Sequence, residues 1–155
     1  MKEYQLHPLC SLFPRMAGYE FECLKLDIKE NGLRTAITIH NGMILDGGNR
    51  YKACVDLGIN PIFEKFVGDA IGQFVLTSNL HRRHLTPGQQ AAIVASVQDW
   101  GKSQSVGKPK CDTSVTFDTA KSRAQQSGTA IVTQRKADPV ANDNTELAAK
   151  VACGE

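Results

Sequence analysis

Between a short apolar strand and the start of a helix, the chain has the sequence Gly47-Gly48-Asn49-Arg50-Tyr51-Lys52-Ala53. A turn at the glycine pair directs backbone N–H groups and the helix N-terminus toward one point, which favours an anion such as phosphate. Arg50 adds a planar, permanently charged group whose shape suits phosphate oxygens. We therefore expect an anion site at residues 47–50, which we call the glycine turn.

Short strands and helices are predicted to alternate around the glycine turn. The pair Asn41-Gly42 is typical of a two-residue hairpin between strands at 36–40 and 43–46. Helices are expected at 19–31, 49–57, 70–80 and 87–100, and a further strand at 62–67. The helix at 87 has a strong start in Thr86-Pro87-Gly88-Gln89, which combines an N-cap, a proline at the first position and a glutamine at the third. Residues 1–100 are therefore expected to form one α/β domain.

Composition limits the classes of function that the chain can have. Its 155 residues have room for one domain with a core and a smaller appendage. The net charge of +2 is too small to indicate nucleic acid, because non-specific DNA binding needs a concentrated basic face. Partners must therefore be inferred from local patterns.

The cysteines and the N-terminus indicate a cytoplasmic protein with reduced thiols. The chain has five cysteines, an odd number, with no Cys-x-x-Cys pair and no zinc-like spacing to histidine. It begins without an apolar signal region and has no apolar run of the roughly 20 residues that cross a bilayer. No membrane partner is expected.

After residue 100 the composition changes. Residues 101–117 are rich in Ser, Gly, Lys and Thr and predict a flexible linker. Within 118–155, helices at 118–126 and 129–137 around Gly128 have the outline of a degenerate helix-turn-helix. Pro139 is expected to end the second helix, and a last helix is predicted at 145–152.

A second polar segment, Ser78-Asn79-Leu80-His81-Arg82-Arg83-His84-Leu85-Thr86-Pro87, joins two of the predicted helices. It places an amide, two arginines and two histidines beside the N-terminus of the second helix, which suits a polyphosphate or a DNA backbone. The alternative is that this run is a solvated bend, as most charge clusters are.

These segments together resemble the N-terminal domain of the ParB family, whose fold is shared with sulfiredoxin. Pro14-Arg15 matches the arginine-bearing segment at the start of that domain, and residues 32–39 match the stretch after its first helix. The glycine turn matches the Gly-x-x-Arg phosphate motif. Residues 78–82, followed by Leu85-Thr86-Pro87, match the second phosphate motif, usually Glu-Asn-x-x-Arg followed by Leu-x-Pro. The resemblance spans residues 6–98 and implies an α/β fold with a small mixed sheet and flanking helices.

The resemblance also implies a site for CTP or ATP with Mg²⁺. The residues that it assigns to the nucleotide are Arg15, Gly47, Gly48, Asn49, Arg50, Ser78, Asn79 and Arg82. Asn79 is the candidate metal ligand, whereas Ser78 replaces the glutamate that usually helps to hold the metal. Because a hydroxyl binds magnesium less strongly than a carboxylate, we expect nucleotide binding with slow or absent hydrolysis. Whether the chain is a nucleoside triphosphatase stays open.

Sulfiredoxin activity is not expected, although the fold is shared. That enzyme needs a reactive cysteine in its glycine motif, and the position that aligns with it is Gly48. Cys54 is nearby in sequence, but its place on the helix predicts a small core residue instead of an accessible thiolate.

A metal-dependent DNase with nucleotidase activity is the alternative function on this fold. His81 and His84, with Asp46 and Asn79, offer ligands for a metal that would activate water. The competing interpretation is that the histidines contact phosphate, because two-metal nuclease sites depend on carboxylates.

DNA is the expected macromolecular partner. Thr133, Gln134, Arg135 and Lys136 are consecutive residues on the second predicted helix of the helix-turn-helix, where they would supply donors to bases and phosphates. Arg83 is a further candidate for the DNA backbone, and an exposed polar helix face without a partner is the alternative. The expected role is partition, maintenance or regulation of a plasmid, phage or other mobile element. A homodimer is left open.

Overall fold

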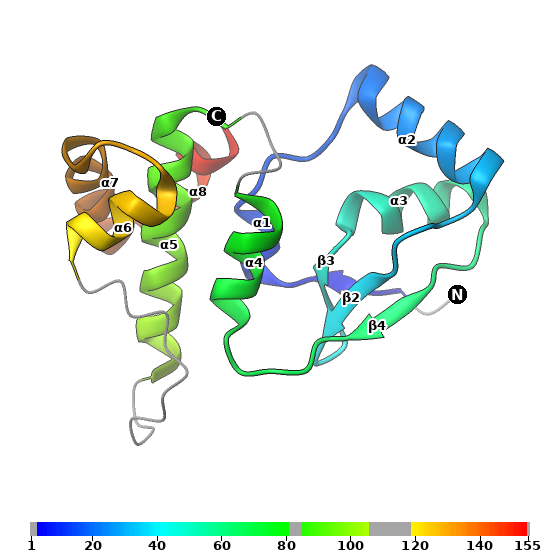
Figure 1. Ribbon diagram of the computed structural model, residues 1–155, viewed down its shortest axis with the longest axis horizontal. Helices are drawn as coiled ribbons and strands as arrows, with labels where there is room; N and C mark the ends of the chain where they lie inside the picture. The colour runs from blue at the N-terminus through cyan, green and yellow to red at the C-terminus, as the bar shows by residue number, and fades with distance from the viewer. Residues whose placement is uncertain (1–2, 81–84, 106–118, 155) are drawn as a thin grey trace. The chain divides into compact units, whose positions relative to one another are not determined.

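The computed structural model describes residues 3–80, 85–105 and 119–154 (Figure 1). The chain divides into two compact units: unit 1 consists of Met1–Ser11 with Arg15–Val67, and unit 2 of Leu12–Pro14 with Gly68–Glu155. The division therefore differs from the expected boundary near residue 100. The helix at Pro87–Ser105 packs with the C-terminal helices and the helix at Ile71–Asn79 packs with it, so both belong to unit 2.

Unit 1 contains a small mixed sheet, as predicted. Its described strands are β1 (Gln5–Leu6), β2 (Ile37–His40), β3 (Met43–Asp46) and β4 (Phe63–Lys65). Their order is β1-β3-β2-β4, with β2 and β3 antiparallel and the two outer strands parallel to their neighbours. The two-residue β1 was not predicted, because its partner β3 lies far along the chain.

The central hairpin is the one that the sequence predicts. Asn41 and Gly42 both have positive φ, 50° and 78°, as a two-residue turn matching the twist of the strands requires. Ile39 pairs with Ile44 in the register of the hairpin. Ile37, Ile44 and Leu45 are fully buried, so the hairpin supplies much of the core of unit 1.

The helices of unit 1 are α1 (Pro8–Ser11), α2 (Gly18–Asn31) and α3 (Gly48–Leu57). In the core between α2 and α3, Phe21 and Ile28 meet Ala53 and Cys54. The small side chains on α3 let the two helices approach closely (Figure 1). The four-residue α1 was not predicted from the sequence.

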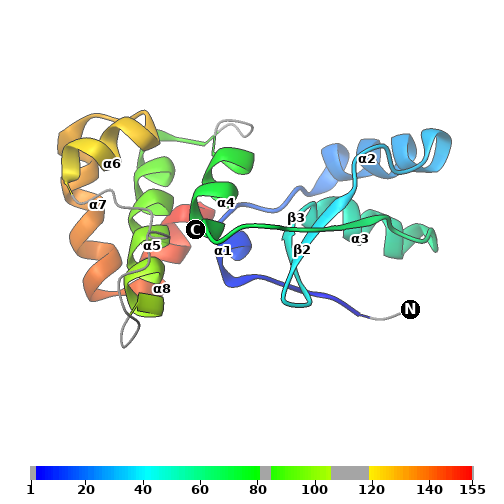
Figure 2. The same ribbon diagram turned by 60° about the horizontal axis from the view of Figure 1, so that its bottom comes forward.

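Unit 2 is helical in its described part. Its helices are α4 (Ile71–Asn79), α5 (Pro87–Ser105), α6 (Ala120–Ser127), α7 (Ile131–Asp143) and α8 (Thr145–Cys153). The last three gather around α5, as Figures 1 and 2 show. Residues 91–98 of α5 are all buried, which makes α5 the centre of the unit. No helix in the described part of the chain is both long and apolar enough to span a bilayer.

The predicted start of α5 is confirmed in its hydrogen bonds. The Thr86 N–H donates to Gln89 Oε1 at 2.8 Å, and the Gln89 N–H donates to Thr86 Oγ1 at 3.3 Å. This is the reciprocal capping pair that the residues at 86 and 89 predict. Gln89 Nε2 also donates to the carbonyl of Ala152 at 3.5 Å, so the same side chain links the start of α5 to the end of α8.

Two predicted helix ends are wrong. The helix α5 continues to Ser105 instead of ending near Trp100, because extending a formed helix costs little even without an apolar face. Ser103 Oγ also donates to the carbonyl of Trp100 at 2.7 Å. The rest of the predicted linker lies outside the described residues. The helix α7 passes through Pro139 to Asp143; Pro139 cannot donate a backbone hydrogen bond, and packing on α5 compensates for this.

Replacing the N-cap of α5 tests its contribution to unit 2. We expect Thr86→Ala to destabilise the protein by about 1 kcal/mol, because two backbone donors lose their partners or their geometry. Urea unfolding followed by circular dichroism measures this change. Thr35→Ala, at an exposed threonine of unit 1, is the control and should leave stability unchanged. Equal midpoints for both variants would contradict a role of the cap.

His7 is a buried titratable group at the end of β1, with 5% of its surface exposed. Its Nδ1 accepts a hydrogen bond from the Leu9 N–H at 3.3 Å, which requires an unprotonated nitrogen. Burial lowers the pKa of His7, and the charge of His40 lowers it further. The folded protein therefore favours a neutral ring.

This lowered pKa predicts that stability decreases in mild acid. Below pH 7 the unfolded chain takes up a proton at His7 near the ordinary pKa of about 6.5, whereas the folded chain resists it. We expect His7 to contribute a loss of up to about 1.4 kcal/mol per pH unit as the pH falls from 6.5 toward its folded pKa. In urea unfolding from pH 7 to 5, His7→Gln should flatten this dependence, and His40→Gln, which removes the smaller cause, should flatten it less. Identical slopes for His7→Gln and wild type would refute the assignment.

Candidate functional site

The glycine turn connects β3 directly to α3. Gly47 is the N-cap of α3 and has φ 87°, a left-handed conformation that favours glycine. Its carbonyl accepts a hydrogen bond from the Tyr51 N–H at 2.8 Å, so the helix is formed from its first turn. Gly47 has no side chain with which to cap the N-terminus of α3. The N-cap therefore leaves the positive end of the helix without a side-chain acceptor.

Two arginines meet at the glycine pair. A Cβ atom on Gly47 would lie 2.9 Å from Arg50 Nη2, and a Cβ atom on Gly48 would lie 2.6 Å from Arg15 Nη1. Leu6 also lies over Gly48, with its Cδ2 atom 2.8 Å from the same Cβ position. A Cβ atom at either glycine would require these side chains to move, and two guanidinium groups lie against the backbone of one turn.

The guanidinium group of Arg50 already has hydrogen-bond partners within the protein. Its Nη2 donates to Asp46 Oδ2 at 3.0 Å and to the carbonyl of Ala36 at 3.3 Å. The Nε atom of Arg50 is buried and has no hydrogen-bond partner among the described residues. The side chains of Arg50 and Asp46 are 24% and 18% exposed, so the ion pair is largely shielded from solvent. Arg15, in contrast, is exposed.

Aromatic side chains pack around Tyr51 in the first turn of α3. The Tyr51 hydroxyl accepts a hydrogen bond from the Tyr4 N–H at 3.0 Å. The rings of Tyr4 and Phe63 lie 4.6 Å apart between centroids, and the ring of Tyr51 lies 6.2 Å from each of them. Sequence reasoning did not identify these supporting residues, because they come from three separate segments.

The second predicted phosphate segment is described only in part. Asn79 ends α4, is 9% exposed, and donates from Nδ2 to the carbonyl of Val75 at 3.1 Å. Ser78 is half-buried, and Arg82 and Arg83 lie outside the described residues. Because the glycine turn belongs to unit 1 and Asn79 to unit 2, their joint use in one nucleotide site stays a prediction.

The thiol nearest in sequence to the glycine turn lies in the core. Cys54 is fully buried against α2. Burial raises the pKa of the Cys54 thiol, and the charge of Arg50 lowers it by a smaller amount. A buried, protonated thiol lacks the accessible thiolate that redox catalysis needs.

Two of the four candidate metal ligands, Asp46 and Asn79, lie in the described part of the chain. Within residues 3–80, 85–105 and 119–154, no three His, Cys, Asp or Glu side chains form a group that could hold a metal ion. His81 and His84 lie outside these ranges. Metal binding at Asn79 and the metal-dependent DNase both stay predictions.

The C-terminal segment is helical, and its interpretation as a helix-turn-helix stays a prediction. Thr119 caps α6 reciprocally with Ser122, and Gly128 ends α6 with φ 70°. On α7, Arg135 and Lys136 are exposed and Thr133 is half-buried. The prediction for Gln134 is wrong: its side chain is fully buried, because it faces α5 and α6 and not solvent. Val132, 64% exposed, occupies the outer face instead.

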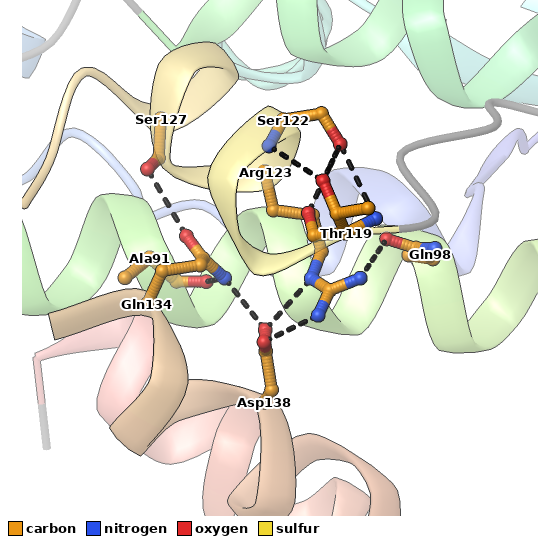
Figure 3. Close-up of polar contacts among 8 residues, drawn as sticks. All are labelled: Ala91, Gln98, Thr119, Ser122, Arg123, Ser127, Gln134 and Asp138. Atoms are coloured by element: carbon orange, nitrogen blue, oxygen red, sulfur yellow. Dashed lines mark hydrogen bonds and ion pairs between the residues drawn. The ribbon is translucent and has the colours of Figure 1, made fainter. Parts of the chain in front are cut away.

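Buried polar side chains join α5, α6 and α7; we call Gln98, Arg123, Ser127, Gln134 and Asp138 the polar network (Figure 3). Arg123 of α6 donates from Nε and Nη2 to the two carboxylate oxygens of Asp138 on α7, and from Nη1 to Gln98 of α5 at 3.4 Å. The Arg123 and Asp138 side chains are 14% and 15% exposed. A two-pronged pair at this depth is a strong, directional contact.

Gln134 completes the polar network. Its Nε2 donates to Asp138 Oδ1 at 2.9 Å and to the carbonyl of Ala91 on α5 at 3.1 Å. Its Oε1 accepts a hydrogen bond from Ser127 Oγ at 3.1 Å. The amide of Gln134 is therefore used inside unit 2, which explains why it is not available to DNA.

No protein-family model, curated protein or solved structure matches the chain. The resemblance to the ParB family is therefore a prediction from the motifs at residues 6–98. Function has to be inferred from the contacts and charges of the glycine turn and of α7.

Proposed function

We propose that the chain is a ParB-like DNA-binding protein that holds the phosphates of CTP or ATP at the glycine turn and contacts DNA through α6 and α7. Its role would be the partition, maintenance or regulation of a plasmid, phage or other mobile element. The observation that carries the proposal is the convergence of Arg15 and Arg50 on Gly47 and Gly48.

Phosphate suits this place for three physical reasons. The N-terminus of α3 carries partial positive charge, and its N-cap, Gly47, has no side chain to accept from its N–H groups. Gly47 and Gly48 have no Cβ atom, so the guanidinium groups of Arg50 and Arg15 can lie directly against the backbone of the turn. The buried Nε of Arg50 has no acceptor among the described residues, and a phosphate oxygen would provide one.

The remaining parts of the site are assigned from the motifs. Asn49 belongs to the glycine turn, and Ser78, Asn79 and Arg82 are proposed to bind further phosphate oxygens. Mg²⁺ bound with the nucleotide would neutralise part of the phosphate charge. With Ser78 in place of a carboxylate, we propose binding with little turnover.

Asp46 opposes anion binding at the same place. Its carboxylate, 3.0 Å from Arg50 Nη2, already compensates the charge that a phosphate would use. An incoming phosphate must therefore share the guanidinium group or displace Asp46 from it. This makes Asp46 and Arg50 a pair of positions with opposite expected effects.

Calorimetric titration with each of the four nucleoside triphosphates and Mg²⁺ tests the site. We expect Arg50→Ala to weaken binding by at least about tenfold, since a hydrogen bond to a charged group contributes about 1.5–3 kcal/mol. Arg15→Ala should weaken binding in the same direction. Asp46→Asn should strengthen it, because the competing charge is removed. Inorganic triphosphate, titrated in parallel, shows how much of the affinity depends on the base.

Arg34→Ala is the matched control, because Arg34 is an arginine of unit 1 whose side chain is 67% exposed and lies 3.8 Å from Asp27. It should bind nucleotide as wild type does. Circular dichroism checks that every variant is folded. Unchanged affinity in both Arg50→Ala and Arg15→Ala, or a wild-type protein that binds none of the four nucleotides, would reject the phosphate site.

The outer face of α7 supports the DNA half of the proposal. Arg135 and Lys136 are exposed neighbours and would contact phosphates, which fix position without reading sequence. Val132 is a large exposed apolar residue in the first turn of α7. An apolar side chain at that place suits contact with a thymine methyl group in the major groove.

Fluorescence anisotropy with a labelled duplex, measured over a range of salt concentrations, tests this face. We expect Arg135→Ala and Lys136→Ala each to reduce the slope of log K against log salt by about one, the value for one phosphate contact. Lys150→Ala removes a lysine that is 54% exposed on α8 and should leave the slope unchanged. Equal losses in all three variants would indicate only a general effect of charge.

A further inference from the structure

One apolar cluster at α7 in the described part of the chain is built mainly from small side chains. Ala95 of α5, Ala141 of α7 and Ala148 of α8 form a buried cluster, with Ala137 and Val140 packed against it. Alanine surfaces offer few ridges to fit into grooves, so they resist rotation of one helix against another only weakly. Packing of these small apolar side chains alone is therefore not enough to fix the rotation of α7 about its axis.

The polar network supplies directional contacts at this interface (Figure 3). Asp138 accepts hydrogen bonds from both Arg123 and Gln134, and Gln134 also donates to Ala91 of α5. Rotating α7 by one residue, about 100°, would separate these partners. It would also break the ion pair of Arg123 with Asp138, whose side chains are only 14% and 15% exposed, and this is unfavourable.

The same rotation would change the outer face. Gln134, Asp138 and Ala141 are spaced i, i+4 and i+7, so they share the inner face of α7. Val132 and Lys136 lie on the opposite side and are exposed. Which residues reach a partner therefore depends on which residues the polar network holds inside.

We infer that Arg123 and Asp138 are positioning residues that fix the rotation of α7, so that Val132, Arg135 and Lys136 face outward together. The inference rests on the proposed function in one respect, namely that DNA is the ligand of this face. Arg123 and Asp138 orient α7 and do not contact DNA themselves; the exposed residues of α7 make that contact. Gln134 reinforces the arrangement by linking Asp138 to the backbone of α5.

The main test variant is Arg123→Met combined with Asp138→Leu. It replaces a buried ion pair by apolar side chains, a change that often keeps or raises stability. Asp138→Asn is a milder second variant that keeps the shape but loses the charge. Glu146→Gln with Lys150→Met is the matched control, because it removes an exposed ion pair of 3.1 Å on α8.

Three measurements are made on each variant: thermal unfolding, amide hydrogen exchange in α7, and affinity for a labelled duplex as a function of salt. We expect the double variant to unfold at or above the wild-type temperature. Its α7 amides should exchange about tenfold faster than those of wild type, because α7 samples other rotations. Its duplex affinity should fall about tenfold with a shallower salt slope, since Arg135 and Lys136 no longer reach phosphates together. The control should match wild type throughout.

A folded double variant with wild-type α7 exchange, affinity and salt slope would overturn the inference. If the double variant does not fold, Asp138→Asn decides in the same way, because wild-type exchange and salt slope there would also overturn it. A wild-type protein that does not bind the duplex contradicts the proposed function instead. Exchange in α7 then still shows whether the network fixes the helix.

Discussion

Close approach of two guanidinium groups to one turn of backbone is the main constraint on the glycine turn of unit 1. Gly47 provides the left-handed conformation that turns β3 into α3, and Gly48 leaves room for Leu6 and Arg15. Asp46 and the Ala36 carbonyl then hold Arg50 over the turn. Segments that are distant in sequence meet at two residues without side chains. A Cβ atom at Gly47 would strain the left-handed turn, and one at Gly48 would require Leu6 and Arg15 to move.

In unit 2, polar contacts help to define how helices with small apolar side chains pack together. Its alanines allow α5, α7 and α8 to approach closely, but they provide little shape to select one arrangement. Buried polar contacts supply that selection at some energetic cost, because Arg123 and Asp138 must be desolvated together. We expect the network to contribute more to a defined arrangement of helices than to net stability.

Features governed by neighbouring residues could be predicted from the sequence. The turn at Asn41-Gly42 and the cap formed by Thr86 and Gln89 are both local, and both are confirmed. The strand β1 could not be predicted, because it depends on pairing with β3. Gln134 was misplaced for a similar reason, since its partners come from α5 and α6. In the candidate site, the glycines and Arg50 followed from the motif, whereas the compensation of Arg50 by Asp46 required the folded hairpin.

The pairing of Arg50 with Asp46 has a consequence for the choice of ligand. Because the Asp46 carboxylate already pairs with Arg50, a ligand must compete with it for the guanidinium group. A neutral or singly charged ligand gains little free energy from this competition. A polyphosphate carries several negative charges, so it can compete with Asp46 for Arg50 while its other oxygens bind the N–H groups of α3. Asp46 would thus make the glycine turn selective for polyphosphates over the small monovalent anions that are abundant in any solution.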